Sequence, residues 1–169
     1  MNPPFSVVFL TTLIGAGQGL FLALFSGQNY TLIQHTLKQP GEFYFNGSML
    51  ALAFLVAGVI ASFFHLGHPE RAWRAATQWR TSWLSREVIV LPAFMGLVFI
   101  YGLLHYFNFN PQVFGTAAIP QFELTTVVGA VTTVVCFALF VCTAMIYACL
   151  KFLEEWHSPL PVVNYTLLG

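Results

Sequence analysis

The segment from Phe122 to Leu150, FELTTVVGAVTTVVCFALFVCTAMIYACL, contains a single charged residue, Glu123. A helix needs roughly 20 apolar residues to cross the ~30 Å hydrocarbon core of a bilayer, so this segment is long enough to span a membrane. Three other stretches have the same character, at about 5–27, 46–66 and 87–107. The sequence therefore predicts an all-α, polytopic transmembrane bundle with four spans.

The composition of the whole chain supports this class. Hydrophobic residues make up 57% and charged residues 7% of the 169 positions, whereas soluble domains carry about 25% charged residues. The apolar runs are too continuous for the alternating strands of an outer-membrane barrel. We expect residues 1–169 to form one integral membrane domain, with a fifth apolar segment starting after 161 and more spans in the native protein. No nucleic-acid partner is expected.

The six basic residues predict an orientation. Cytoplasmic loops of membrane proteins are enriched in Lys and Arg. Lys38 is alone on one predicted side, whereas the other side holds Arg71, Arg74, Arg80, Arg86 and Lys151. The Arg-rich loop between spans two and three, together with the N-terminus, is therefore expected in the cytoplasm.

Few residues in the spans could carry chemistry. The three cysteines, Cys136, Cys142 and Cys149, have spacings that match no iron–sulfur or redox pattern, and we expect them to pack. The chain has no Asp and no phosphate-binding glycine motif. We therefore expect no metal site in this chain, and the histidines and Glu87 remain as candidates.

His65 and Glu87 are predicted to lie at similar depth, at the two ends of a short connection. His65 ends span two, His68 follows it, and Glu87 is placed in the first turn of span three. Each has a structural explanation, because a cationic imidazole is favourable at a helix C-terminus and a carboxylate at an N-terminus. However, ionisable groups at a membrane boundary are costly and often mark a proton or substrate path. Together, His65 and Glu87 form a candidate proton-handling pair.

The connection itself is rich in Arg and Trp. Arg71 and Arg74 are expected on one helical face, with Trp73, Trp79 and Trp83 nearby. This pattern is typical of an amphipathic segment on the membrane surface. It can anchor the chain in lipid, or it can dock acidic side chains of a peripheral subunit.

Two motifs resemble a known family. The residues His65-Leu-Gly-x-Pro-x-Arg-Ala and Ser82-Trp-Leu-Ser-Arg-Glu87 are similar to the membrane-anchor subunits of dimethyl sulfoxide reductase-type molybdoenzymes. Met145-Ile-Tyr-Ala-Cys-Leu-Lys-Phe-Leu-Glu-Glu-Trp156 resembles the variant found in sulfite-oxidising complexes. The resemblance covers the whole chain, which would form the N-terminal half or so of an anchor with about eight spans.

The resemblance implies a role in a respiratory oxidoreductase of the bacterial inner membrane. The partners would be an iron–sulfur subunit with several clusters and a catalytic subunit with molybdopterin guanine dinucleotide. The anchor would exchange electrons with membrane ubiquinone or menaquinone, in sulfite oxidation or in sulfoxide reduction. His65 and Glu87 would bind quinone and relay protons, while the supporting or docking residues would be His68, Arg71, Arg74, Trp83 and Arg86.

Two alternatives belong to other classes. A b-type cytochrome would need paired axial histidines at matching depth, and His65 and His105 are expected on opposite membrane sides. The other alternative is a transporter or a purely structural tether. A tether would have no quinone site, so that loss of His65 and Glu87 would leave quinone coupling unchanged.

Overall fold

A computed structural model describes residues 5–33, 39–64, 69–114, 122–149 and 160–168. Four helices in it are long and apolar enough to cross a membrane: α1 (Phe5–Ile33), α2 (Gly41–Phe63), α3 (Trp83–Tyr106) and α4 (Leu124–Ala148). The predicted all-α membrane fold is thereby confirmed. The shorter elements are the 3₁₀-helix η1 (Pro69–Gln78), the strands β1 (Gln112–Phe114) and β2 (Phe122–Glu123), and the helix α5 (Leu160–Leu168).

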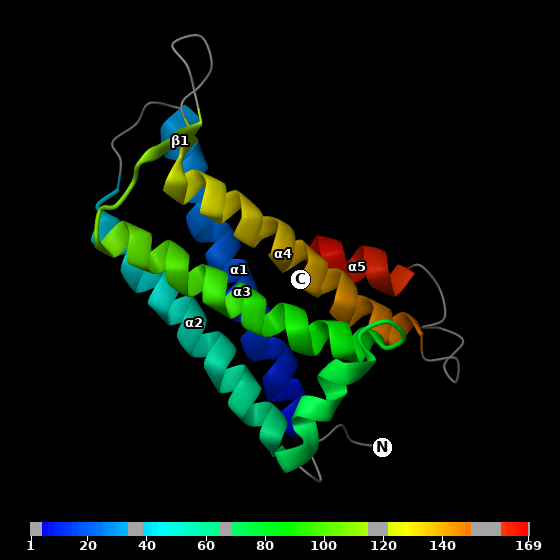
Figure 1. The fold of residues 1–169 in the computed structure, drawn as a ribbon. Coiled ribbons are helices and arrows are strands. Elements are labelled where there is room, and N and C mark those ends of the chain that lie inside the picture. Colours follow the sequence, from blue (N-terminus) through cyan, green and yellow to red (C-terminus); the bar gives the residue numbers. More distant parts are fainter. Residues whose placement is uncertain (1–4, 34–38, 65–68, 115–121, 150–159, 169) are drawn as a thin grey trace.

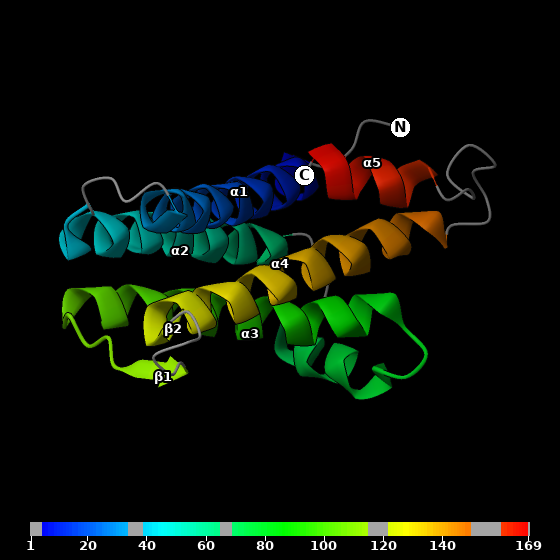
Figure 2. The same ribbon diagram turned by 90° about the horizontal axis from the view of Figure 1, so that it is seen from above.

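Consecutive long helices run antiparallel and pack as neighbours, α1 on α2, α2 on α3 and α3 on α4, with α5 lying along α4 (Figures 1 and 2). Antiparallel β1 and β2 lie in the connection between α3 and α4. We call this end of the bundle the strand end. The opposite end, where η1 connects α2 to α3, is the η1 end.

Small residues bring α1 and α2 close together. A Cβ atom at Gly17 would lie 2.9 Å from the backbone oxygen of Ala51, and one at Gly58 would lie 2.8 Å from Cγ1 of Ile14. Lipid tails are as apolar as the side chains, so helices in a membrane associate through such close packing rather than by escaping water. These positions fix how α1 and α2 meet.

Large aromatic side chains fill the centre of the bundle. Phe21 of α1 meets Phe94 and Tyr101 of α3 edge-on, at ring-centroid distances of 5.7 and 5.4 Å. All three side chains are fully buried. In contrast, only 22–39% of the most apolar window of each long helix is buried, so the described residues leave most of the helix surface uncovered.

Three buried polar side chains connect helices at the strand end. Tyr101 donates a hydrogen bond from its hydroxyl to Gln28 Oε1 at 2.6 Å, and Gln28 Nε2 donates to Thr125 Oγ1 at 3.1 Å. The network joins α3, α1 and α4. Each group is paired with another, and hydrogen bonds between polar side chains help to hold membrane helices together.

Tyr101→Phe is expected to lower the stability of the bundle, because it removes the donor to Gln28 without changing the shape of the ring. Interhelical hydrogen bonds in membranes contribute about 0.6 kcal/mol on average and up to ~1.7 kcal/mol. Thermal unfolding in detergent measures the effect. Tyr106→Phe is the matched control, because this side chain in the same helix is 53% exposed. Equal midpoints for the two variants would contradict the prediction.

Candidate functional site

Glu87 lies in the second turn of α3, one turn later than expected. The helix begins at Trp83, after Ser82, whose hydroxyl accepts a hydrogen bond from the backbone N–H of Ser85 at 3.4 Å. The span was predicted to start at residue 87, so its predicted start was four residues too late, and the prediction that Glu87 lies in the first turn was wrong. Because the effect of the helix dipole falls off beyond the first turn, the dipole alone does not explain a carboxylate here.

Instead, Glu87 is held by a neighbouring helix. The hydroxyl of Thr143 in α4 donates to Glu87 Oε1 at 2.7 Å. Hydrogen bonds to a charged acceptor are roughly twice as strong as neutral ones. This hydrogen bond therefore holds the carboxyl group of Glu87 between α3 and α4.

The carboxyl group lines a cavity of about 150 Å³ at the η1 end. An apolar cavity of about this size can hold a benzene ring. Most of the walls are apolar, and the polar lining residues are Thr11 of α1, Glu87 of α3, Thr143 and Tyr147 of α4, and Tyr165 of α5. The lining residues are Val7, Leu10, Thr11, Ile14, Leu84, Glu87, Thr143, Ile146, Tyr147 and Tyr165. The site thus offers space for one ring beside a carboxyl group and two phenols.

Arg86 and Trp83 hold the connection between η1 and α3. The guanidinium of Arg86 donates to the backbone oxygens of Trp79 at 3.0 Å and Arg80 at 3.1 Å, and it lies 4.1 Å from the ring centroid of Trp83. The hydroxyl of Ser85 donates to the backbone oxygen of Ala75 in η1. Arg86 and Trp83 are therefore placed to support the η1 end of the bundle, and neither lines the cavity.

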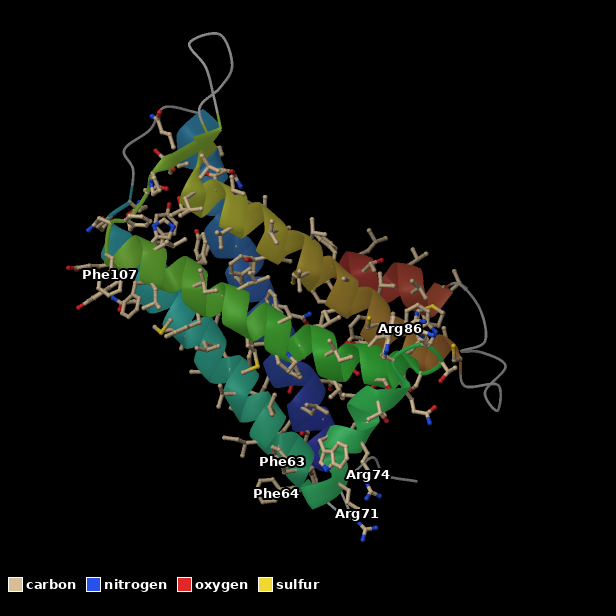
Figure 3. The ribbon with its side chains drawn as sticks, in the orientation of Figure 1. Phe63, Phe64, Arg71, Arg74, Arg86 and Phe107 are labelled. Carbon is tan, nitrogen blue, oxygen red and sulfur yellow. The ribbon has the colours of Figure 1, made fainter. Side chains whose placement is uncertain are left out.

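Arg71 and Arg74 lie on the exposed surface of η1. A 3₁₀-helix has three residues per turn, so these two residues share one side of η1. Figure 3 shows both side chains projecting away from the long helices, near Phe63 and Phe64 at the end of α2. The exposed ring of Trp73 lies 5.6 Å from the guanidinium of Arg74. The segment is amphipathic, as the sequence indicated, although it is a 3₁₀-helix.

His65 and His68 lie outside the described residues. His105, the one histidine of five within them, is at the strand end, opposite Glu87 along α3. Its ring packs between Tyr44 and Tyr101 at centroid distances of 4.6 and 4.7 Å. The cavity that it lines is also about 150 Å³, but its other lining residues are almost all polar. This cavity is a poor match for an apolar ring.

The cysteines differ in their surroundings. Cys136 and Cys142 are buried in α4, as expected, whereas Cys149 at the end of this helix is exposed. Within the described part of the chain, no three side chains of His, Cys, Asp or Glu come together as a possible metal site.

Thr143, Tyr147 and Tyr165 were not predicted as site residues. Thr143 and Tyr147 are four residues apart in α4, so they lie on the same face of the helix. That spacing was available in the sequence. What the sequence lacked was any signal that this face of α4 meets Glu87.

Comparisons with known proteins identify the family of the chain. The family model described as DMSO reductase anchor subunit (DmsC) matches residues 1–169. A sulfite dehydrogenase subunit of Allochromatium vinosum is 57% identical over 169 residues, which are 100% of this chain and 52% of the relative. The chain thus spans about half the length of that relative. No solved structure matches significantly. The chain belongs to the family of DMSO reductase anchor subunits.

Proposed function

We propose that this chain forms the quinone-reactive part of a membrane anchor in a molybdopterin and iron–sulfur oxidoreductase. The observation that carries the proposal is the ring-sized cavity beside Glu87 at the η1 end. In the complex, electrons pass between an iron–sulfur partner subunit and membrane quinone, while this chain binds the quinone and handles protons.

The cavity suits the head group of a quinone. Such a ring is flat and apolar on both faces, and it carries two carbonyl oxygens that accept hydrogen bonds. Leu10, Ile14 and Ile146 provide apolar walls, and the phenols of Tyr147 and Tyr165 are potential donors. Small-molecule sites commonly combine apolar walls with a few oriented polar groups.

Glu87 is the proton-carrying group of the proposed site. A quinone becomes a quinol by gaining two electrons and two protons, so its site needs groups that give or take protons. A positioned carboxyl group within hydrogen-bond reach can do this. We assign the second proton to His65, which follows Phe64 in the sequence after α2 ends at the η1 end.

The partner subunits would dock at the same end. We propose that Arg71 and Arg74 pair with acidic side chains of the iron–sulfur subunit, with His68 beside them in the sequence. Guanidinium groups suit carboxylate recognition because they offer several donors in a planar fork. Arg86 and Trp83 would keep η1 in place for this contact.

The reaction that we favour is sulfite oxidation, since the 57% identical relative is named as a sulfite dehydrogenase subunit. Sulfite, water and quinone then give sulfate and quinol, with both electrons passing from the molybdenum subunit through the clusters to the quinone. Sulfoxide reduction would run the quinone step in the opposite direction. We place the complex in the bacterial inner membrane, with the Arg-rich connection in the cytoplasm.

A photoreactive short-chain quinone tests the proposal on the complete complex in membranes. Illumination is expected to label residues that line the cavity, in α1 near Leu10, in α3 near Glu87 or in α4 near Ile146. An excess of unmodified quinone should prevent this labelling by competition. Peptide mass spectrometry locates the modified residues.

Two outcomes would contradict the proposal. One is labelling that excess quinone does not reduce. The other is competed labelling confined to other parts of the complex, such as the strand end near His105, where the second cavity lies. A purely structural tether would give one of these results.

A further inference from the structure

We infer that Thr143 is a positioning residue that keeps Glu87 hydrogen-bonded in both of its protonation states. The inference rests on the proposed function, because it concerns the proton that Glu87 exchanges with quinone. It assigns a specific role in proton transfer to α4, a helix outside the two sequence motifs.

The geometry around Thr143 offers its single hydroxyl hydrogen two acceptors. Oγ1 lies 2.7 Å from Glu87 Oε1 and 3.1 Å from the backbone oxygen of Leu139. A hydroxyl group has one donor and two acceptor lone pairs. The hydrogen can therefore point to either oxygen, and Oγ1 can accept a hydrogen bond when it points to Leu139.

Each protonation state of Glu87 uses one of these arrangements. When Glu87 is ionised, Thr143 donates to the carboxylate. When Glu87 carries a proton, the carboxylic acid donates to Oγ1 of Thr143, which turns its own hydrogen to the oxygen of Leu139. No polar group loses its partner in either state, so the cost of a buried unsatisfied group is avoided. A rotation of one hydroxyl accompanies each proton transfer.

The other groups around Glu87 do not replace this function. Cys142 and Tyr147 of α4 and Tyr165 of α5 are the titratable side chains near it from the neighbouring helices. The cavity-lining residues of α1 are not titratable, and Arg86 of α3 is engaged with backbone oxygens of the connection. Among the described residues, Thr143 supplies the side-chain hydrogen bond to the Glu87 carboxyl group.

Thr143 differs from two other threonines of α4, Thr132 and Thr133. The hydroxyls of Thr132 and Thr133 donate to backbone oxygens one turn earlier in the same helix, those of Val128 and Gly129. Thr133 therefore provides a matched control, with the same residue type in the same helix but no contact to Glu87.

The test compares Thr143→Val, Thr143→Ser and the control Thr133→Val in the complete complex. Valine has the shape of threonine without the hydroxyl, whereas serine keeps it. Two quantities are measured: the pH profile of quinone turnover, and the infrared carbonyl band of protonated Glu87, which is identified by its absence in Glu87→Gln. Thr143→Ala serves as a second hydroxyl-free variant if Thr143→Val yields no complex.

Loss of the hydroxyl is expected to disfavour the ionised form of Glu87 more than the neutral form, because hydrogen bonds to charged groups are stronger. The pH profile of Thr143→Val should therefore move to higher pH by about one unit, and the carbonyl band should move to higher frequency. Thr143→Ser and Thr133→Val should keep both properties of the wild type.

Two results would separate the inference from the proposed function. If Glu87→Gln blocks quinone turnover while Thr143→Val keeps the wild-type pH profile and carbonyl band, the role of Thr143 is wrong and the quinone site stands. If Glu87→Gln leaves quinone turnover unchanged, the proposed quinone site beside Glu87 is contradicted, and so is the inferred role of Thr143 in quinone chemistry.

Discussion

Glu87→Gln is expected to lower quinone turnover by the complex about 100-fold or more, which is the usual contribution of a positioned acid or base. Glutamine is nearly the same size and can still accept from Thr143, but it cannot carry the proton. In the proposed complex, the electron path through the partner subunits does not involve this side chain. Oxidation of the substrate with a soluble dye, which bypasses quinone, should therefore remain at the wild-type level.

Glu42→Gln is the control for this experiment. Glu42 lies in the first turn of α2 at the strand end and is exposed, so its loss should leave both the quinone and the dye reactions unchanged. Equal loss of the two reactions in Glu87→Gln would indicate damage to the complex and would contradict the specific role of Glu87. Unchanged quinone turnover would place the quinone elsewhere.

Gly17→Ala is expected to destabilise the bundle by about 1–3 kcal/mol, the range for overpacking a tight site. The added Cβ would lie 2.8 Å from Cγ of Leu55 and 2.9 Å from the backbone oxygen of Ala51. The side chain of Leu55 can turn, but the backbone oxygen cannot move without shifting α2. The substitution should therefore separate α1 from α2, and the midpoint of thermal unfolding in detergent should fall.

Gly15→Ala is the matched control, two residues away in the same helix. A Cβ atom at Gly15 would meet no atom within 4 Å. Because alanine is a better helix former than glycine, this variant should be as stable as the wild type or slightly more so. A Gly17→Ala protein as stable as Gly15→Ala would show that the α1–α2 contact is not as close as described.

The positions of the long helices could be predicted because each is apolar on all sides over a bilayer-spanning length. Glu87 could also be singled out, as a rare ionisable residue at a span end. The error about its turn arose because Trp83 and Leu84 belong to α3, and Ser82 caps it at its N-terminus. A run of apolar residues identifies a membrane-spanning segment, but it does not identify the capping residue at which the helix begins.

Contacts between helices could not be predicted from the sequence. Gln28 is hydrogen-bonded to Tyr101, which is 73 positions away in the sequence, and to Thr125, which is 97 positions away. Thr143 and Glu87, which are also joined by a hydrogen bond, are 56 positions apart in the sequence. Helices that are apolar on every face give no periodic signal for which face is inward. Such partners became visible only once the packing of the helices was known.

The tryptophans of this chain give its two ends different optical properties. Trp73 lies in η1, Trp79 follows it, and Trp83 begins α3, whereas the described residues of the strand end include no tryptophan. Indole emission from the described residues therefore arises at the η1 end. Trp83 is adjacent in sequence to Leu84, which lines the cavity. Since quinones quench indole fluorescence at short range, Trp83 is a built-in reporter beside Glu87, and a ligand bound only at the strand end would leave the emission of Trp83 largely unchanged.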